Sequence, residues 1–316
     1  MISIALASYN GEKYIGEQID SILVQTYQDF ELVVCDDCST DNTWLILEEY
    51  VQKDNRIKIV RNDTNLGFKK NFEKAIMLCK GEYVALSDQD DIWTENHLEI
   101  LLCNIGEKSI SGGNAVLVDE IGNPLGKKLN EVDKFFFFQE DKFLYRILFI
   151  HDPIQGASML MPKSFVEKCL PIPENVLYHD AWFAACACLD NGISYTFEII
   201  NMYRQHGENI TFSSHNKRRR NIFQKIRVRL DFLKYGDRTD RFYYVDKLKE
   251  KYGFKNEDFE FIYHVFERIK SHKMLKFNDL IILWNNFHFI ITAKTHRGFL
   301  DFLFNLHVKK PITKES

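Results

Sequence analysis

The first ninety residues alternate between two hydrophobic periods, and this alternation limits the folds open to the chain. Continuous apolar runs, which predict buried strands, occupy residues 2–7, 30–35, 58–60 and 82–86. Between these runs apolar residues recur at helical spacing, as in Tyr14, Ile15, Ile19 and Ile22. Strands that alternate with helices predict a parallel sheet with right-handed crossovers and helices on both faces. The sequence therefore predicts an α/β fold.

Polar residues follow three of these predicted strands, at residues 8–12, at Asp36 and Asp37, and at residues 88–91. Ligands of parallel sheets bind at the carboxyl ends of the strands, so we expect these residues to line one crevice. Neither the glycine-rich dinucleotide fingerprint nor the phosphate-binding P-loop sequence occurs in the chain. A nucleotide in this crevice would therefore be held by side chains and a metal ion.

Three carboxylates, Asp88, Asp90 and Asp91, occur within four residues after the fourth predicted strand. Like charges this close are tolerated when they are solvated, hydrogen-bonded or neutralised by a cation. Carboxylate oxygens suit Mg²⁺ or Mn²⁺, and the alternative is an acidic turn before the helix expected near Thr94. An EF-hand calcium loop fits the sequence poorly, because its required glycine would fall on Trp93. The spacing alone leaves the metal site and the acidic turn both open.

The totals describe a soluble globular protein. A chain of 316 residues, 45% hydrophobic and 27% charged, is long enough for one large or two ordinary domains. A net charge of −4 argues against a nucleic-acid binder. Cys35 and Cys38 match a C-x-x-C motif, but no second pair of cysteines or histidines has metal-ligand spacing. The seven scattered cysteines are therefore predicted to be reduced thiols.

The sequence shows neither a secretory nor a membrane-spanning pattern. Met1 leads directly into the first strand without a basic segment, and no apolar run approaches the roughly 20 residues that span a bilayer. The predicted location is the cytoplasm.

The composition changes near residue 215, where we place the boundary between a domain at 1–215 and a helical region at 216–316. Residues 217–234 contain eight basic residues and one acid, interleaved with apolar residues, and predict a basic amphipathic helix. Such a helix can be a solvated face, a nucleic-acid patch or a surface for anionic lipids.

Six motifs in order resemble those of the family 2 glycosyltransferases of the GT-A fold. They are residues 7–12 (Ala-Ser-Tyr-Asn-Gly-Glu), 34–43, 65–67 (Asn-Leu-Gly), 88–91 (Asp-Gln-Asp-Asp), 179–180 (His-Asp) and 203–206 (Tyr-Arg-Gln-His). The resemblance covers residues 1–212, and the fourth and sixth motifs are most similar to those of rhamnosyltransferases. It implies a Rossmann-like, mostly parallel sheet flanked by helices, followed by a helical C-terminal subdomain. Two positions depart from the family pattern: Cys38 replaces a frequent glycine, and His179 replaces a frequent acid.

The resemblance also implies roles for individual residues. Asp180 would be the general base, with an ordinary acid in the first turn of a helix as the alternative. For Asp36 and Asp37 the alternative to nucleotide binding is capping of the helix after Thr40. The implied nucleotide-sugar contacts are Ser8, Tyr9, Glu12, Asp36, Asp37, Asn65, Lys69, Asp88 and Arg204, and the implied metal ligands are Asp88, Asp90 and His206.

The predicted function is that of a bacterial inverting glycosyltransferase with Mg²⁺ or Mn²⁺ as its cofactor. It would move a sugar from a UDP- or dTDP-linked donor to a glycan or lipid-linked acceptor in capsule, O-antigen or other cell-surface polysaccharide synthesis. Lipid-linked acceptors favour an anionic-lipid surface as the role of the basic helix, with peripheral contact at the inner face of the plasma membrane and no nucleic-acid partner. The alternatives are a sugar-phosphate nucleotidyltransferase, whose basic triphosphate loop is missing from residues 8–11, and a non-catalytic nucleotide-binding protein.

Overall fold

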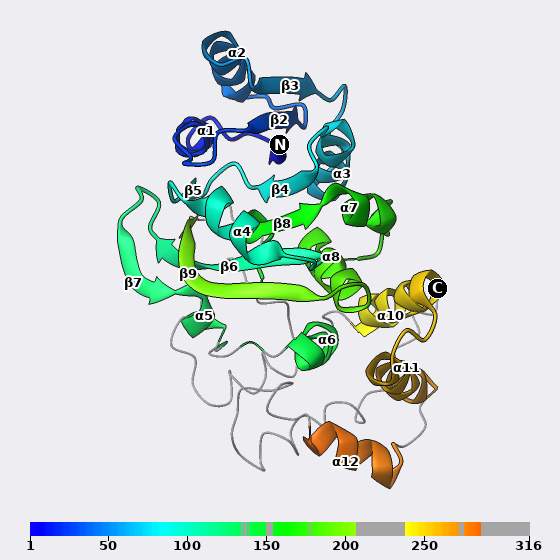
Figure 1. Ribbon diagram of the computed structural model, residues 1–316. Coiled ribbons are helices and arrows are strands. Elements are labelled where there is room, and N and C mark those ends of the chain that lie inside the picture. Colours follow the sequence, from blue (N-terminus) through cyan, green and yellow to red (C-terminus); the bar gives the residue numbers. More distant parts are fainter. Residues whose placement is uncertain are drawn as a thin grey trace, which may run out of the picture. The chain divides into compact units, whose positions relative to one another are not determined.

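The computed structural model describes residues 1–133, 135, 138, 140–149, 154–176, 178–206, 238–271 and 275–285. The chain divides into two compact units (Figure 1). The first contains residues 1–140, 152–173 and 178–212, and the second contains residues 141–151, 174–177 and 213–316. The predicted boundary near residue 215 and the predicted basic helix at 217–234 lie outside the described residues.

Within the described residues, the first unit is built on one nine-stranded sheet with the order β3-β2-β1-β4-β8-β6-β9-β5, and β7 pairs with β6 (Figure 1). The strands are β1 (Ile2–Ser8), β2 (Phe30–Asp36), β3 (Ile57–Arg61), β4 (Tyr83–Ser87), β5 (Ile92–Trp93), β6 (Ile110–Val118), β7 (Pro124–Lys128), β8 (Met159–Pro162) and β9 (Ile193–Arg204).

The first four strands are parallel, as the alternating periods predict. In the register of β1 and β2, Ser8 pairs with Asp36, while Leu6 pairs with Ser87 at the end of β4. The carboxyl ends of three strands therefore meet at one edge of the sheet, as predicted, whereas a ligand crevice at this edge stays a prediction. Beyond β4 the sheet is mixed, because β8 is antiparallel to both β4 and β6, and β5 is antiparallel to β9.

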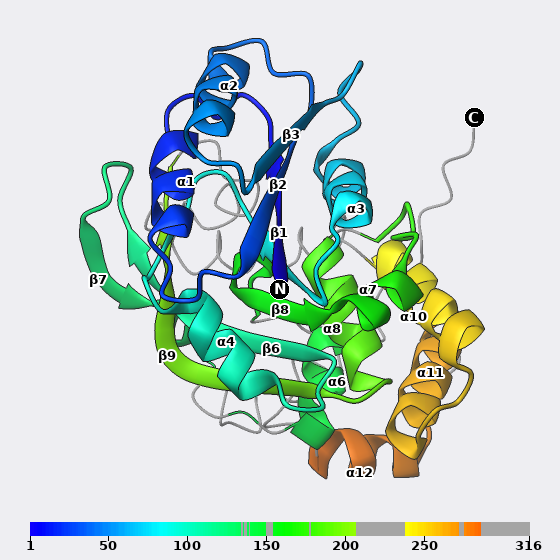
Figure 2. The ribbon, with the colours of Figure 1, turned by 45° about the horizontal axis from the view of Figure 1, so that its top comes forward.

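Helices cover both faces of the parallel strands. Figure 2 shows α1 (Ile15–Leu23) and α2 (Thr43–Lys53) on one side of β1, β2 and β3, with α3 (Phe68–Leu78) on the other. The remaining helices of the first unit are α4 (His97–Ile105), α5 (Leu129–Val132), α7 (Lys163–Cys169) and α8 (His179–Cys188), and α6 (Glu140–Phe149) begins at its boundary.

A short 3-10 turn, η1 (Gly156–Ser158), leads into β8. Gly156 passes so close to α8 that an added Cβ would lie 3.1 Å from His179 Nε2, and the turn leads the chain past this helix.

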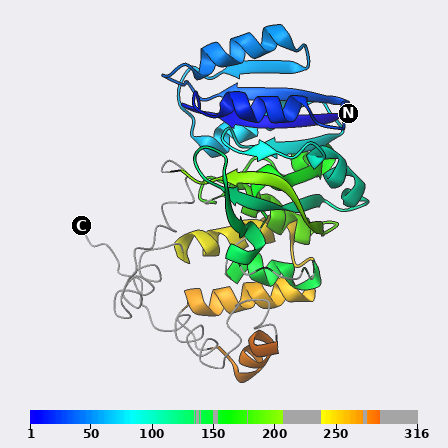
Figure 3. The same ribbon diagram turned by 90° about the vertical axis from the view of Figure 1, so that its left-hand side faces the viewer.

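The second unit contributes α10 (Arg238–Tyr252), α11 (Glu257–Lys270) and α12 (Phe277–Asn285). Helices α10 and α11 contact each other (Figure 3). Leu248 of α10 and Phe259 of α11 are buried. These three helices agree with the predicted helical character of residues 216–316 in the part of that region that the structure describes. No helix in the described parts of the chain is long and apolar enough to cross a membrane.

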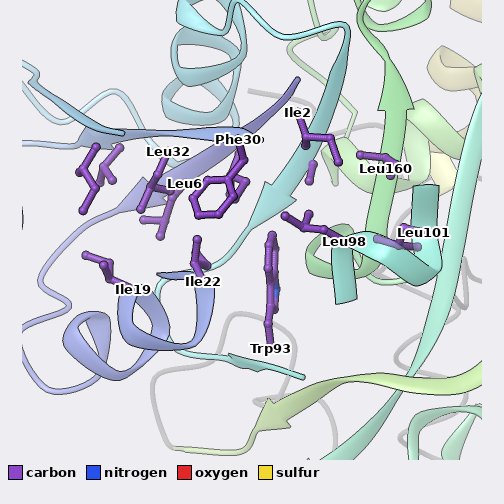
Figure 4. Close-up of a cluster of buried hydrophobic side chains, with 14 of the residues drawn as sticks. Ile2, Leu6, Ile19, Ile22, Phe30, Leu32, Trp93, Leu98, Leu101 and Leu160 are labelled. Atoms are coloured by element: carbon purple, nitrogen blue, oxygen red, sulfur yellow. The ribbon is translucent and has the colours of Figure 1, made fainter. Parts of the chain in front are cut away.

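The main core lies between the parallel strands and the helices α1 and α4. Figure 4 shows Ile19 and Ile22 of α1 facing the strand residues Leu6 and Leu32, with Trp93 beside Leu98. All six side chains lie in one buried hydrophobic cluster. This packing fixes the strand ends from which the polar loops emerge.

Candidate active site

The acidic loop between β4 and β5 is anchored by Asp91. This side chain is fully buried, and its carboxylate accepts hydrogen bonds from Asn201 Nδ2 at 2.8 Å, Gln155 Nε2 at 3.1 Å and the Arg204 backbone N–H at 3.2 Å. These donors come from β9 and from the segment before η1. Asp91 therefore holds the loop in place, while Asp88 and Asp90, on either side of Gln89, are half-buried.

The pKa values of two carboxylates in this loop, Asp88 and Asp91, are raised. Burial, followed by the charge of Asp90, raises the pKa of Asp91 to about 8, although its hydrogen-bond donors oppose the shift. The pKa of Asp88 is raised well above its usual range, first by burial and then by the charges of Asp91, Asp90 and Asp180. Geometry brings Asp180 close to this loop, because a Cβ added at Gly156 would lie 3.6 Å from the Asp180 Cβ, and the preceding residue Gln155 donates to Asp91.

His206 places an imidazole nitrogen, a second type of metal-binding atom, beside the Asp90 carboxylate. Its Nε2 lies 2.8 Å from Asp90 Oδ2, and its ring lies 4.8 Å from that of Tyr14. Among the described residues, no three His, Cys, Asp or Glu side chains are arranged to hold a metal ion by themselves. Asp90 and His206 nevertheless fit a divalent cation that takes its other ligands from phosphate and water, as Mg²⁺ and Mn²⁺ do.

Arg204 has an environment different from the one expected for a diphosphate ligand. Its side chain is 1% exposed, with Nε donating to the Asp90 carbonyl at 2.8 Å and Nη1 to the Glu120 carbonyl at 2.9 Å. Nη2 pairs with the Glu17 carboxylate at 2.5 Å, and the guanidinium lies over the Tyr14 ring. The side chain supports the backbone of the acidic loop and is enclosed by protein groups.

The two carboxylates after β2 are also engaged with the protein. Asp36 is buried and accepts the Ser39 backbone N–H at 3.0 Å, and the Arg61 Nε lies 3.5 Å away. Asp37 accepts Asn62 Nδ2 at 2.7 Å and the backbone N–H groups of Leu66 and Gly67, each at 2.8 Å. Both carboxylates hold the loops that follow the parallel strands. Neither caps α2.

The Thr43 N–H in the first turn of α2 is instead bound by Asp41 at 3.0 Å. Glu12, in the loop after β1, accepts the Asn42 backbone N–H at 2.9 Å and so ties this loop to the loop after β2. Asn65 accepts the Gly67 N–H at 3.1 Å. These contacts make the loops of the crevice mutually supporting.

Tyr9 differs from its neighbours because its side chain is 46% exposed, whereas Ser8 is buried. Its ring at the end of β1 is therefore available to a ligand. Lys69, in the first turn of α3, is half-buried, and its charge helps to lower the pKa of His179. Contacts of these residues with a nucleotide sugar stay predictions.

The candidate base Asp180 lies in the first turn of α8, where its Oδ1 accepts the Ala181 N–H at 2.7 Å. The preceding His179 is buried and stacks on Phe72 at 4.3 Å between ring centroids. Burial lowers its pKa, and neither ring nitrogen has a hydrogen-bond partner among the described residues. Trp182 is a buried core residue and donates its indole N–H to the Cys169 carbonyl.

Sequence reasoning missed three supporting residues: Gln89, Gln155 and Asn201. Asn201 carried a usable signal, since it is a polar residue within the otherwise apolar run at 199–202. Gln89 lies inside the acidic motif, but its residue type alone predicts no role there. No local pattern marks Gln155, because its partner Asp91 is 64 residues away in the chain.

Residues 3–167 match the sequence model of glycosyl transferase family 2, which covers more than half of the chain. The chain belongs to this family. A relative described as an uncharacterized glycosyltransferase of Haemophilus influenzae is 30% identical over 290 residues, which cover 87% of this chain and 83% of the relative.

A second relative is the UDP-Glc:alpha-D-GlcNAc-diphosphoundecaprenol beta-1,3-glucosyltransferase WfgD of Escherichia coli, 39% identical over 111 residues. That match covers 35% of this family 2 chain and 43% of WfgD. The chain spans only 36% of the length of a further relative, the glycosyltransferase GlyG of Streptococcus pneumoniae.

The fold is similar to that of Staphylococcus aureus TarS 1-349, solved in complex with UDP-GlcNAc. The TM-score is 0.58 at 21% identity, over 96% of this chain and 79% of TarS. The similarity confirms the predicted GT-A fold, a mixed α/β architecture with a mostly parallel sheet and flanking helices.

Proposed function

We propose that this protein transfers a sugar from a UDP- or dTDP-linked donor to a hydroxyl group of a glycan or lipid-linked acceptor, with inversion at the anomeric carbon. The observation that carries the proposal is the shared site of Asp88, Asp90 and Asp180: burial, followed by the charges of Asp91, Asp90 and Asp180, raises the pKa of Asp88. A donor-binding acidic loop and a separate carboxylate on α8 are the two parts that a single displacement requires.

Asp180 acts as the general base in this proposal. It takes the proton from the acceptor hydroxyl as that oxygen bonds to the anomeric carbon, and the bond from this carbon to the nucleoside diphosphate breaks. One displacement inverts the configuration. The first turn of α8 favours the ionised carboxylate, because the N-terminal end of a helix carries partial positive charge.

Asp90 and His206 would hold Mg²⁺ or Mn²⁺, with Asp88 next to the metal and the ribose. When bound, the cation supplies charge neutralisation for the departing diphosphate. The raised pKa of Asp88 supports this assignment, since a cation would offset the repulsion among these carboxylates.

The donor would lie along the carboxyl ends of β1, β2 and β4. The exposed Tyr9 ring would stack on the base, while Ser8, Glu12, Asp36 and Asp37 would shape the base and ribose site, and Asn65 and Lys69 would approach the diphosphate or sugar. In this arrangement Arg204 acts indirectly, through the loop backbone that it supports.

The acceptor is the least constrained part of the proposal. The name of WfgD describes an acceptor attached to diphosphoundecaprenol, which supports a lipid-linked acceptor and a role in cell-surface polysaccharide synthesis for this chain. A peripheral position at the inner face of the plasma membrane, through residues 217–234, and rhamnosyl transfer are the narrower parts of the same proposal.

The first test is a thermal-shift panel of UDP, dTDP, GDP and CDP with and without Mn²⁺, followed by turnover measurements with the matching sugar donors. A ligand of the folded state raises the melting temperature according to its affinity. We expect a metal-dependent rise with UDP or dTDP that is lost in Asp90→Asn. No rise with any of the four nucleotides would contradict the donor site.

The second test separates an enzyme from a binding protein. Asp180→Asn should lower kcat by about a thousandfold while it leaves the nucleotide shift unchanged, because the base acts on the acceptor. Asp258→Asn, the same change in the first turn of α11, is the matched control and should keep full turnover. Full turnover in Asp180→Asn would refute the assignment of the base.

A further inference from the structure

The side-chain amide of Gln89 forms a bridge between the loop after β1 and the acidic loop after β4. The Tyr9 backbone N–H donates to Gln89 Oε1 at 2.8 Å, and Gln89 Nε2 donates back to the Tyr9 carbonyl at 3.0 Å. One amide thus satisfies both backbone polar groups of a single residue, as a neighbouring strand would. The two residues are 80 positions apart in the chain.

Gly11 makes room for this bridge. A Cβ added at Gly11 would lie 2.3 Å from Gln89 Oε1 and 2.7 Å from its Cδ, far inside van der Waals contact. The Gly11 N–H also donates to Thr43 Oγ1 at 2.7 Å, which ties this part of the loop to α2. A side chain at position 11 would therefore displace the Gln89 amide more readily than the loop backbone.

The bridge joins the two parts of the site that have different tasks in the proposed function. Tyr9 presents the exposed ring expected to stack on the base, whereas Asp88 and Asp90, the neighbours of Gln89, are the residues expected to contact the ribose, diphosphate and metal. The distance between the base and the diphosphate is set by the covalent structure of the donor. A rigid link between the two loops pre-organises the site for that distance and lowers the entropic cost of donor binding.

We propose that Gln89 is a positioning residue for donor binding. Its side-chain amide holds the base-binding loop and the acidic loop at a fixed distance from each other, so that the two loops bind the two ends of the nucleotide sugar as one rigid site. The inference rests on the proposed function, since it assigns the two loops to the two ends of the donor. Gln89 itself need not touch the sugar. Its loss should weaken donor binding and leave the acceptor site unchanged.

The test uses Gln89→Met, which keeps the length of the side chain and removes both hydrogen bonds. We expect the Kd of the nucleoside diphosphate with Mn²⁺, measured by calorimetry, and the KM of the donor to rise about tenfold, as expected for the loss of two net hydrogen bonds. The KM of the acceptor should stay within about twofold of wild type, because only uniform donor binding is lost.

Gln25→Met is the matched control. Gln25 also bridges backbone groups through its amide, accepting the Leu98 N–H at 3.0 Å and donating to the Thr94 carbonyl at 2.7 Å, but it contacts neither loop of the site. It should lower the melting temperature without changing the donor Kd. A purely structural role for Gln89 would give the same result in both variants.

A double-mutant cycle tests the role of Gly11. Gly11→Ala alone should weaken donor binding as much as Gln89→Ala, because its new methyl group displaces the amide. In the double variant the amide is absent, so the second change should add nothing. Independent, additive losses in the cycle would overturn the inference.

The remaining outcomes separate this inference from the proposed function. If the wild-type protein binds none of the four nucleotides, the donor site is wrong and the inference falls with it. If the wild type binds and Gln89→Met binds equally well, or if the acceptor KM rises as much as the donor KM, the proposed function stands and the role of Gln89 is refuted.

Discussion

His97 makes the stability of the fold depend on pH in a way that can be calculated. Its ring is fully buried, stacks on Trp93 at 3.8 Å with 5° between the ring planes, and places Nδ1 2.8 Å from the Ile200 carbonyl. Burial lowers its pKa to about 3, and the bond to the Ile200 carbonyl opposes the shift only in part. The folded protein therefore holds a neutral imidazole throughout the range in which an unfolded histidine, with a pKa of 6.5, takes up a proton.

The sign follows from proton uptake. Below pH 6.5 the unfolded chain binds one more proton at this position than the folded chain, so acid favours unfolding. Between about pH 7.5 and about pH 5.0 the folded-state pKa of about 3 predicts a loss of about 2 kcal/mol in the free energy of unfolding. Asp88 and Asp91 contribute with the opposite sign, because their pKa values are raised in the folded state.

The assay is urea unfolding at the two pH values for the wild type and for His97→Asn. Asparagine does not titrate and can still donate a hydrogen bond to the Ile200 carbonyl, so the contributions of all other groups cancel in the comparison. The wild type should lose about 2 kcal/mol more than the variant on acidification. His264→Asn, at a histidine that is 60% exposed, should behave like the wild type. Equal losses in the wild type and His97→Asn would refute the reasoning.

Three further predictions concern stability. Arg204→Met should lower the free energy of unfolding by about 2–5 kcal/mol, because two backbone carbonyls lose their buried donor; an unchanged melting temperature would contradict the supporting role. Cys38→Gly should raise the free energy of unfolding, measured in urea, by about 1 kcal/mol, because Cys38 has a φ of 63° and glycine carries no steric penalty at this angle. A loss of stability would show that the contacts of the Cys38 side chain outweigh this backbone strain. His179→Phe should raise the free energy of unfolding by about 1 kcal/mol, because it replaces two unpartnered nitrogens with a ring that still stacks on Phe72. A lower melting temperature would show that those nitrogens have hydrogen-bond partners in solution.

The sequence alone determined the parallel half of the sheet and the position of the acidic loop. Strands β1 to β4 are short apolar runs separated by helices of regular period, and both signals are local. Once the strands are parallel, their carboxyl ends must meet, so the order of the elements along the chain is enough to bring Ser8, Asp36 and the loop after Ser87 together. The family motifs added Asp180, which no local pattern distinguishes from an ordinary helix acid.

The tertiary structure alone decided which of these polar groups are already hydrogen-bonded to other parts of the protein. Asp91 is bound by Gln155 and Asn201, and Arg204 supports the backbone of Asp90; these partners lie 64 to 114 positions apart in the chain. Such contacts depend on the antiparallel placement of β5 and β8 and on the register of β9. A one-residue slip in that register would turn Asn201 to the opposite face of the sheet, and no local pattern in the sequence specifies it.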